Sequence, residues 1–363
     1  MDITIRPINA SKIRVTVEDE GIREDLYQSL RFVEPNYQPS TFSKWDGEVR
    51  LYDKRTGIMN YGLLAHLLKF SKERGWSVDM DSSFKNDITP ITREQIQEWC
   101  DSIDFRTNGT RITPYDYQVE GLYLAIKYGR MTLLAATSAG KSLLQYMIIR
   151  FSLMVNPDIK ILLTVPSINL VSQMLGDFKD YSSHNGWDAD KFCHQIYEGS
   201  SPYTNKQVVI STWQSIQKLP AEYFTQYNML IGDEVHLYAA KCLSYIGDSC
   251  INAYQRVGLT GTLKQEVMHP LQVQQQFGPI KRIVTTKELQ DAGRAAKTLV
   301  TMLHLQYPTE DRKKLQKEFD GGYKEEIEFL IAHPKRNSII QNLARNLEGN
   351  SLFLFDRVDS HLE

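Results

Sequence analysis

The sequence predicts an α/β fold in which helices cover a parallel β-sheet, with a small α+β module before it. Short apolar runs rich in β-branched residues alternate with longer segments of helical periodicity; the runs are 131–135, 159–165, 207–211, 229–233 and 256–260. Such alternation is typical of parallel strands joined by helical crossovers. Before residue 105 the pattern is different, which indicates a separate module.

The N-terminal module is expected to span residues 1–105. Segments 3–17 and 48–52 alternate apolar and polar residues like strands, and residues 61–74 place apolar side chains at helical spacing. Gly75 is expected to end that helix, and a short helix is expected at 93–103. The boundary is then expected near Asn108 and Gly109.

Composition is that of an ordinary globular protein without a strong overall charge. The 363 residues are 42% hydrophobic and 24% charged, with a formal net charge of −2. These values argue against a disordered, collagen-like or coiled-coil protein. They also argue against an overall positive charge that would attract nucleic acid. The 4 cysteines are widely spaced, so neither a disulfide scaffold nor a zinc site is expected. The sequence predicts neither a signal peptide nor a membrane span, and a cytoplasmic location is expected.

A phosphate-binding loop is predicted directly after the run at 131–135. Its residues are Ala136, Thr137, Ser138, Ala139, Gly140, Lys141 and Ser142. Small residues let successive N–H groups, and the positive end of the following helix, face a diphosphate. Lys141 would neutralise the β- and γ-phosphates of ATP, and Ser142 would ligate Mg²⁺. Ala135 stands where the first glycine usually does, and the alternative is a strand–turn–helix corner that binds no ligand.

Two adjacent carboxylates, Asp233 and Glu234, end the run at 229–233. In a parallel sheet, the carboxyl ends of the strands share the edge at which a phosphate loop lies, so we expect this pair to face the loop. Asp233 would hold Mg²⁺, mainly through water, and Glu234 would polarise the attacking water. The alternative is a strand end capped by acidic residues.

The order of these motifs resembles that of the superfamily 2 helicases. Val165-Pro166-Ser167, Ser211-Thr212-Trp213-Gln214, Asp233-Glu234-Val235-His236 and Leu259-Thr260-Gly261-Thr262 follow the order of that family's motifs over roughly residues 112–262. The resemblance implies a RecA-like P-loop NTPase domain at 106–296 that uses ATP and Mg²⁺. It also implies that ATP is bound by Thr137, Ser138, Ala139, Gly140, Lys141 and Ser142, with adenine at Tyr115 and Gln118, and that His236, Thr260 and Thr262 couple hydrolysis to motion.

A closer resemblance, to the recombination and fork-remodelling helicases of T4-like phages, extends beyond the motor. The residues that carry it are 42–51, 62–64, 137–143 and 172–181. The last of these ranges includes Asp177, Phe178, Asp180 and Tyr181. Ala136 replaces the usual proline of that family, which removes no ligand. The resemblance implies an ATP-dependent DNA helicase or translocase that acts on branched recombination intermediates and stalled forks, with RNA–DNA hybrids left open. It also implies single-strand-binding or recombination proteins as partners and the host-cell cytoplasm as location.

Two surfaces are expected to contact DNA without reading its sequence. Family position places Pro166, Thr212, Trp213 and Gln214 against a strand backbone, and the alternative for Trp213 is a core aromatic residue. In the N-terminal module, basic residues interleave with aromatic ones in a way that fits phosphate contacts and a stacked ring, and the alternative is a solvated face. These residues are Lys44, Trp45, Arg50, Lys54 and Arg55.

Residues 297–363 are expected to begin a second RecA-like domain. Strand-like runs at 298–305 and 351–355 flank a helical segment at 312–344, and the later motifs of such a domain do not follow. ATP lies between two such domains, and the second supplies arginines to the transferring phosphate. We therefore expect an N-terminal fragment, or one chain of a split protein, that binds ATP but alone hydrolyses it poorly.

Three other functions share the motor motifs and stay open. A phage DNA-packaging ATPase would also carry a nuclease, whereas the acidic residues at 318–328 follow a helical, mixed-charge pattern. A non-hydrolysing module would use ATP only to clamp DNA. A restriction-type translocase subunit would be recognised by its partner chains. Metal-dependent DNA cleavage would identify the first, and function that survives Glu234→Gln but not Lys141→Ala would identify the second.

Overall fold

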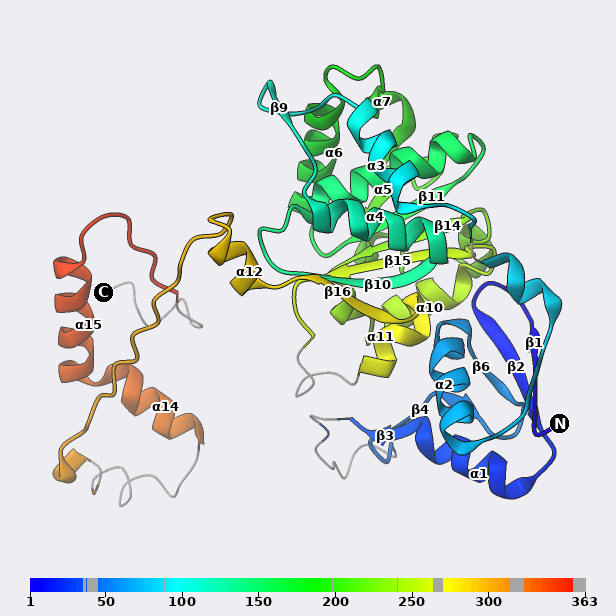
Figure 1. Cartoon of the computed structure of the whole chain (residues 1–363). Coiled ribbons are helices and arrows are strands. Elements are labelled where there is room, and N and C mark those ends of the chain that lie inside the picture. The colour runs from blue at the N-terminus through cyan, green and yellow to red at the C-terminus, as the bar shows by residue number, and fades with distance from the viewer. Residues whose placement is uncertain are drawn as a thin grey trace. The chain divides into compact units, whose positions relative to one another are not determined.

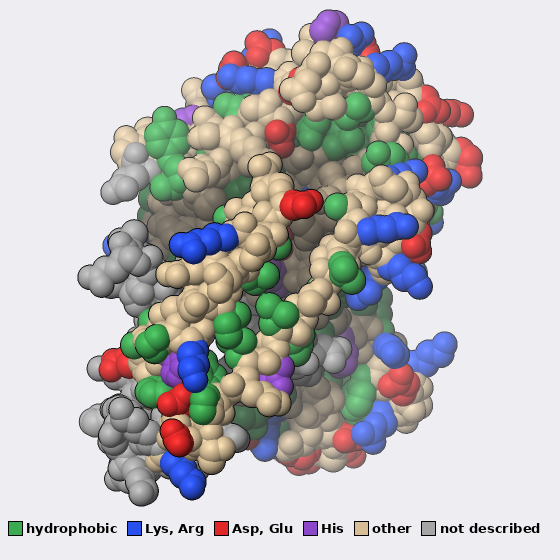
Figure 2. Space-filling view, turned by 90° about the vertical axis from the view of Figure 1, so that its left-hand side faces the viewer, with side chains coloured by type: hydrophobic (Ala, Val, Ile, Leu, Met, Phe, Trp, Pro, Cys, Tyr) green, Lys and Arg blue, Asp and Glu red, His purple; other side chains and the backbone are tan. Residues whose placement is uncertain are grey.

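The chain folds as two compact units, Met1–Ala296 and Lys297–Glu363. The computed structural model in Figure 1 describes residues 1–34, 37, 45–87, 89–197, 199–239, 241–263, 270–311, 313 and 323–354. Among the residues it describes, no helix combines the length and apolar composition needed to cross a bilayer. Basic and acidic side chains are interspersed on the face shown in Figure 2.

A parallel sheet of seven strands forms the centre of the first unit and confirms the predicted fold class. The strands run in the order β12-β13-β11-β14-β15-β10-β16. Their bounds are β10 Arg130–Ala135, β11 Ile161–Val165, β12 Cys193–Ile196, β13 Val208–Thr212, β14 Met229–Asp233, β15 Gln255–Thr260 and β16 Ile280–Val284. The sequence analysis missed β12, a short edge strand whose residues mix apolar and polar side chains.

Helices cover both faces of this sheet (Figure 1). One face packs against α3 Arg93–Ser102, α4 Asp116–Tyr128, α5 Lys141–Val155, α6 Ile168–Ser182 and α7 Ala189–Phe192. The other packs against α8 Trp213–Ile216, α9 Ala221–Phe224, η3 Val235–Ala239, α10 Lys241–Ser249 and α11 Pro270–Phe277. A last helix, α12 Thr286–Asp291, follows β16. Because both faces are buried, the inner strands are continuous apolar runs, which is why the sequence reveals them.

The N-terminal residues form their own mixed sheet in the order β5-β6-β2-β1-β7. Its strands are β1 Ile3–Pro7, β2 Lys12–Val17, β5 Tyr52–Asp53, β6 Ile58–Asn60 and β7 Val78–Met80. Around it lie α1 Glu20–Ser29, the hairpin β3 Arg31–Val33 with β4 Glu48–Arg50, η1 Tyr61–Leu63, α2 Leu64–Arg74 and η2 Ser82–Asp87. Gly75 ends α2 with a left-handed φ of 71°, as predicted. A second hairpin, β8 Phe105–Thr107 with β9 Thr110–Ile112, leads into the large sheet.

A buried polar network joins the N-terminal sheet to the large sheet within the first unit. The guanidinium of Arg256, at the start of β15, is fully buried and donates to Ser11 Oγ at 2.5 Å and Gln276 Oε1 at 3.1 Å. Asp248 of α10 accepts from Lys12 Nζ at 2.7 Å and from Asn60 Nδ2 at 2.8 Å. The bonds of Arg256 satisfy a charge that would otherwise be costly to bury, and the partly exposed Asp248 adds contacts between the two sheets. Together they fix the N-terminal module on the large sheet.

We expect Arg256→Ala to lower the free energy of unfolding by at least about 3 kcal/mol, because it leaves a cavity and several buried acceptors without a donor. Urea denaturation measures this change. Arg6→Ala is the matched control: Arg6 pairs with Asp79 at the surface, and its loss is expected to cost less than about 1 kcal/mol. Equal losses in the two variants would contradict the role given to the network.

The second unit corrects two sequence-based expectations. Residues 297–308 and 351–354 contain no strand, while α14 Tyr323–Ala332 and α15 Pro334–Asn346 confirm part of the helix predicted at 312–344; Phe355 lies outside the described residues. Leu299 is 91% and Val300 82% exposed. A β-branched pattern makes a strand only when a neighbouring strand pairs with its backbone, and the described part of this unit provides none.

Candidate nucleotide and nucleic-acid sites

The predicted phosphate loop connects β10 to α5 and has the curvature that phosphate binding requires. Ser138 and Gly140 adopt positive φ angles of 68° and 69°. Another residue at Gly140 would be strained by the left-handed backbone, and its Cβ atom would lie 2.5 Å from Gln118 Nε2 and displace that side chain. Gln118 donates to the carbonyls of Ala139 and Gly140 at 3.0 and 3.1 Å, which ties the loop to α4. The loop is therefore held in shape by the protein itself.

Both predicted carboxylates face the first turns of α5. Lys141 Nζ lies 3.0 Å from Glu234 Oε1, and Gln145 Nε2 donates to Asp233 Oδ1 at 3.1 Å. The loop and the acidic pair thus share the carboxyl edge of the sheet, as the nucleotide-binding prediction requires. Glu234 has a positive φ of 48°, an uncommon conformation for a non-glycine residue and one often found at functional sites.

The two carboxylates differ in their electrostatic surroundings. Burial raises the pKa of Asp233 to about 6, the charge of Glu234 adds to that shift, and Lys141 opposes it. Burial also acts to raise the pKa of Glu234, but the hydrogen bond and charge of Lys141 outweigh it and hold that pKa below its ordinary value. Glu234 is therefore the carboxylate kept ionised, the form that accepts a proton from water.

The residues expected to couple hydrolysis to motion meet around one hydroxyl group. Thr260 Oγ1 lies 3.1 Å from both Glu234 Oε2 and the carbonyl oxygen of Thr262, and 2.9 Å from His236 Nδ1. His236 Nδ1 is also 3.3 Å from Glu234 Oε2. Glu234 is thus in direct contact with the end of β15 and with His236 of η3.

The expected adenine site contains residues that the sequence analysis did not identify. Tyr115 is 41% exposed, and the guanidinium of Arg294 covers its ring at 3.9 Å from the centroid. Tyr117 packs beside it and has a buried hydroxyl without a hydrogen-bond partner. The amide oxygen of Gln118 accepts from the backbone of Tyr115 at 2.8 Å. The site thus combines a partly exposed aromatic ring and a cation, features that suit a base.

Oxygen atoms suited to Mg²⁺ lie around the loop. The Ser142 hydroxyl and the Asp233 carboxylate are hard oxygen ligands, and the buried Gln145 Oε1 beside Asp233 has no hydrogen-bond partner. Within the described ranges, no group of three His, Cys, Asp or Glu side chains could hold a metal ion. This donor set fits an ion that is bound largely through substrate phosphates and water, which is the usual mode for Mg²⁺.

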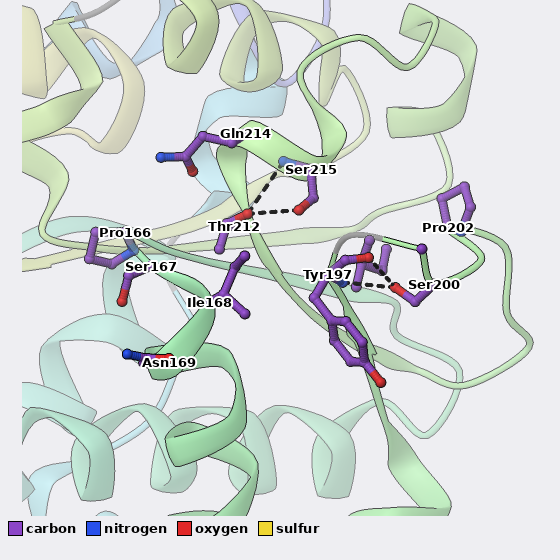
Figure 3. A pocket seen from close by; sticks show the side chains of 12 residues that line it. Pro166, Ser167, Ile168, Asn169, Tyr197, Ser200, Pro202, Thr212, Gln214 and Ser215 are labelled. Carbon is purple, nitrogen blue, oxygen red and sulfur yellow. Dashed lines mark hydrogen bonds between the residues drawn. The ribbon is translucent and has the colours of Figure 1, made fainter.

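A groove of about 660 Å³ opens at the ends of β11, β12 and β13 (Figure 3). Residues that line it include Pro166, Asn169, Tyr197, Thr212 and Gln214. The side chains of Ser167 and Thr212 accept from the backbone N–H groups of Leu170 and Ser215, in the first turns of α6 and α8, and so fix both walls. Three residues of the predicted motor contact, Pro166, Thr212 and Gln214, meet here.

Trp213 does not line this groove. Its ring packs against the buried cluster below the sheet, and its buried Nε1 has no hydrogen-bond partner.

The basic residues predicted in the N-terminal module are largely paired with acidic ones. Lys54 contacts Glu20 at 2.9 Å and Glu24 at 2.6 Å. Arg50 pairs with Asp46, and with Glu48 at 2.8 Å. Trp45 is 47% exposed and Arg55 is exposed, whereas Lys44 lies outside the described residues. The local positive charge is therefore smaller than the sequence suggests.

Comparison with known proteins gives consistent results. Residues 89–265 match the family described as type III restriction enzyme, res subunit. The ATP-dependent DNA helicase uvsW of Enterobacteria phage T4 is 30% identical over 364 residues, which cover 99% of this chain and 71% of that protein. A crystal structure of T4 UvsW aligns with a TM-score of 0.70 at 29% identity, over 95% of this chain and 67% of that one. The DNA 3'-5' translocase XPB2 of Sulfurisphaera tokodaii is 27% identical over 67% of this chain and 50% of its own length.

Proposed function

Because the chain belongs to the family of the phage T4 helicase uvsW, we propose that it uses ATP and Mg²⁺ to move along and remodel branched DNA. Its family makes the chain an ATP-hydrolysing DNA helicase or translocase. The use of Mg²⁺ and the preference for recombination intermediates and stalled forks go beyond what the family shows and form our proposal.

The observation that carries the proposal is the sharing of one sheet edge by two sites. Lys141, Asp233 and Glu234 meet at the carboxyl edge of the parallel sheet. The groove of Figure 3 opens at the same edge, because Pro166 and Thr212 stand at the carboxyl ends of β11 and β13. The serine, threonine, asparagine and glutamine side chains in its lining suit a nucleic-acid backbone, which proteins bind through hydroxyls and backbone N–H groups without reading sequence.

The contacts of these side chains support the roles that we give them in hydrolysis. Lys141 exchanges its ion pair with Glu234 for the phosphate oxygens of ATP, which leaves Glu234 able to orient water and take its proton. When bound, Mg²⁺ supplies positive charge that offsets the charge developing on the transferring phosphate. Thr260 follows the movement of Glu234 and passes it to His236.

The proposal is tested by ATP hydrolysis measured with single-stranded, duplex and forked DNA of equal nucleotide content. We expect the chain alone to hydrolyse ATP slowly, and we expect DNA to stimulate this slow rate, most strongly as the fork. Equal rates on all three would remove the preference for branched DNA, and no stimulation by any of them would contradict a DNA-driven motor.

We place the main DNA contact in the groove rather than in the N-terminal module, because Arg50 and Lys54 are already neutralised by acidic neighbours. Gln214→Glu is therefore expected to weaken DNA binding about tenfold, since it sets a negative charge against phosphates. Fluorescence anisotropy with labelled DNA measures the dissociation constant.

Gln217→Glu is the matched control for the groove. It makes the same chemical change three residues later, just beyond α8 and outside the groove lining. We expect it to leave the dissociation constant within about twofold, because the half-buried Gln217 side chain contacts the backbone carbonyl of Gln214 and not the groove. Equal weakening by the two variants would point to overall charge and against the groove.

A further inference from the structure

The hydroxyl of Ser142 has a partner from α6, Tyr181, which the nucleotide site described above does not include. The two hydroxyl oxygens are 2.8 Å apart. Tyr181 lies in the last turn of α6 and packs against Tyr146 of α5, with ring centroids 5.6 Å apart. A tyrosine hydroxyl carries its proton at neutral pH, so Tyr181 can donate to Ser142.

Tyr181 is held rigidly. Its helix is capped at one end by Ser167, which accepts from the backbone of Leu170 at 3.4 Å. Along its length α6 buries Val171, Met174 and Phe178 in the main hydrophobic core. A side chain on such an element can fix the direction of a neighbouring hydroxyl more closely than a loop residue can.

A serine that ligates a metal must keep a lone pair directed at the ion, and outer partners decide that direction. Asp233, which also faces the site, is engaged by Gln145. On α6, one turn before Tyr181, the carboxylate of Asp177 also forms a hydrogen bond with the Ser142 hydroxyl. Two side chains of α6 thus constrain the Ser142 hydroxyl. The Asp177 carboxylate accepts a hydrogen bond from it, and the Tyr181 hydroxyl can donate to one of its two lone pairs. The second lone pair is then left for a metal ion.

We propose that Tyr181 is a positioning residue that orients the Ser142 hydroxyl for the metal bound with the nucleotide. This inference rests on the proposed function, since it presumes that nucleotide binds at Lys141 and Ser142 together with a divalent cation. It assigns a task to the Asp177–Tyr181 segment, which the sequence singles out but to which the motor motifs give no role.

The test is Tyr181→Phe, which keeps the ring and removes the hydroxyl. The readout is binding of a fluorescent ADP analogue as Mg²⁺ is titrated, followed by the same measurement in EDTA. We expect the Mg²⁺ concentration for half-maximal binding to rise about tenfold, the usual effect of losing an outer partner of a metal ligand. Binding in EDTA is expected to stay at the wild-type value, because the hydroxyl acts only through the metal.

Tyr146→Phe is the matched control, because its hydroxyl bonds to Arg150 and Asn185 in the same aromatic cluster. We expect it to leave the Mg²⁺ requirement unchanged, and thermal melting shows that each variant is folded. An unchanged requirement in Tyr181→Phe, or an equal shift in both variants, overturns the inference and leaves the proposed function intact. Failure of the wild-type chain to bind the ADP analogue with Mg²⁺ overturns both.

Discussion

Replacing Glu234 with glutamine is expected to reduce ATP hydrolysis about 10²- to 10⁴-fold while ATP still binds. The carboxylate is kept ionised by Lys141 and held by Thr260, so it is the group placed to take a proton from water. Loss of a general base has an effect of this size. Steady-state ATPase rates with saturating DNA, together with binding of a fluorescent ATP analogue, measure the two properties separately.

The control for this prediction is Glu120→Gln, the same chemical change at the surface of α4, where Glu120 pairs with Arg93. Its hydrolysis rate is expected to equal that of the wild type. Hydrolysis that persists in Glu234→Gln would assign the proton transfer to another group. Loss of hydrolysis with DNA remodelling intact would favour a module that uses ATP only as a clamp.

The inner strands of the large sheet are the part of the fold most directly predictable from sequence. Strands such as β11 and β14 are buried on both faces, and a continuous apolar run is the consequence. β12 escapes this rule because it is a short edge strand with two half-buried polar residues, His194 and Gln195. The runs at 298–305 and 351–355 show the opposite error, since an apolar pattern does not reveal whether a second strand is there to pair with it.

The candidate site contains some residues that are adjacent in the sequence and others that only the fold brings together. The phosphate loop and the acidic pair are predictable because their chemistry depends on adjacent residues at the end of a strand. Tyr181 and Arg294 reach the site from segments far along the chain, so only the fold reveals their contacts with Ser142 and Tyr115.

The basic run of the N-terminal module shows why charge counted along the sequence misleads. Two carboxylates, those of Glu20 and Glu24, neutralise Lys54. Both lie on α1, some thirty residues earlier in the chain. Their pairing follows from the fold, so a local excess of positive charge in sequence does not become one on the surface.

Lys141→Ala is expected to weaken nucleotide binding by about 2–5 kcal/mol, at least ~30-fold in Kd, because it removes the cation that faces the β- and γ-phosphates. The same change leaves Glu234 beside Asp233 without the charge that now separates their behaviour. Repulsion between two carboxylates and the phosphates therefore adds to the lost attraction. Titration with fluorescent ATP and ADP analogues measures the loss, which should be larger for ATP, whose γ-phosphate also faces Lys141.

The charge of Lys141 has to be distinguished from an effect of lysine removal in general. Lys69→Ala serves this purpose: Lys69 is an exposed residue of α2 whose side chain lies 3.8 Å from Glu73. Its variant should bind both nucleotides like the wild type. An ATP affinity that survives in Lys141→Ala would mean that the curled loop and the end of α5 hold the triphosphate by backbone N–H groups alone. The ion pair between Lys141 and Glu234 would then be a structural contact rather than the resting state of a phosphate-binding site.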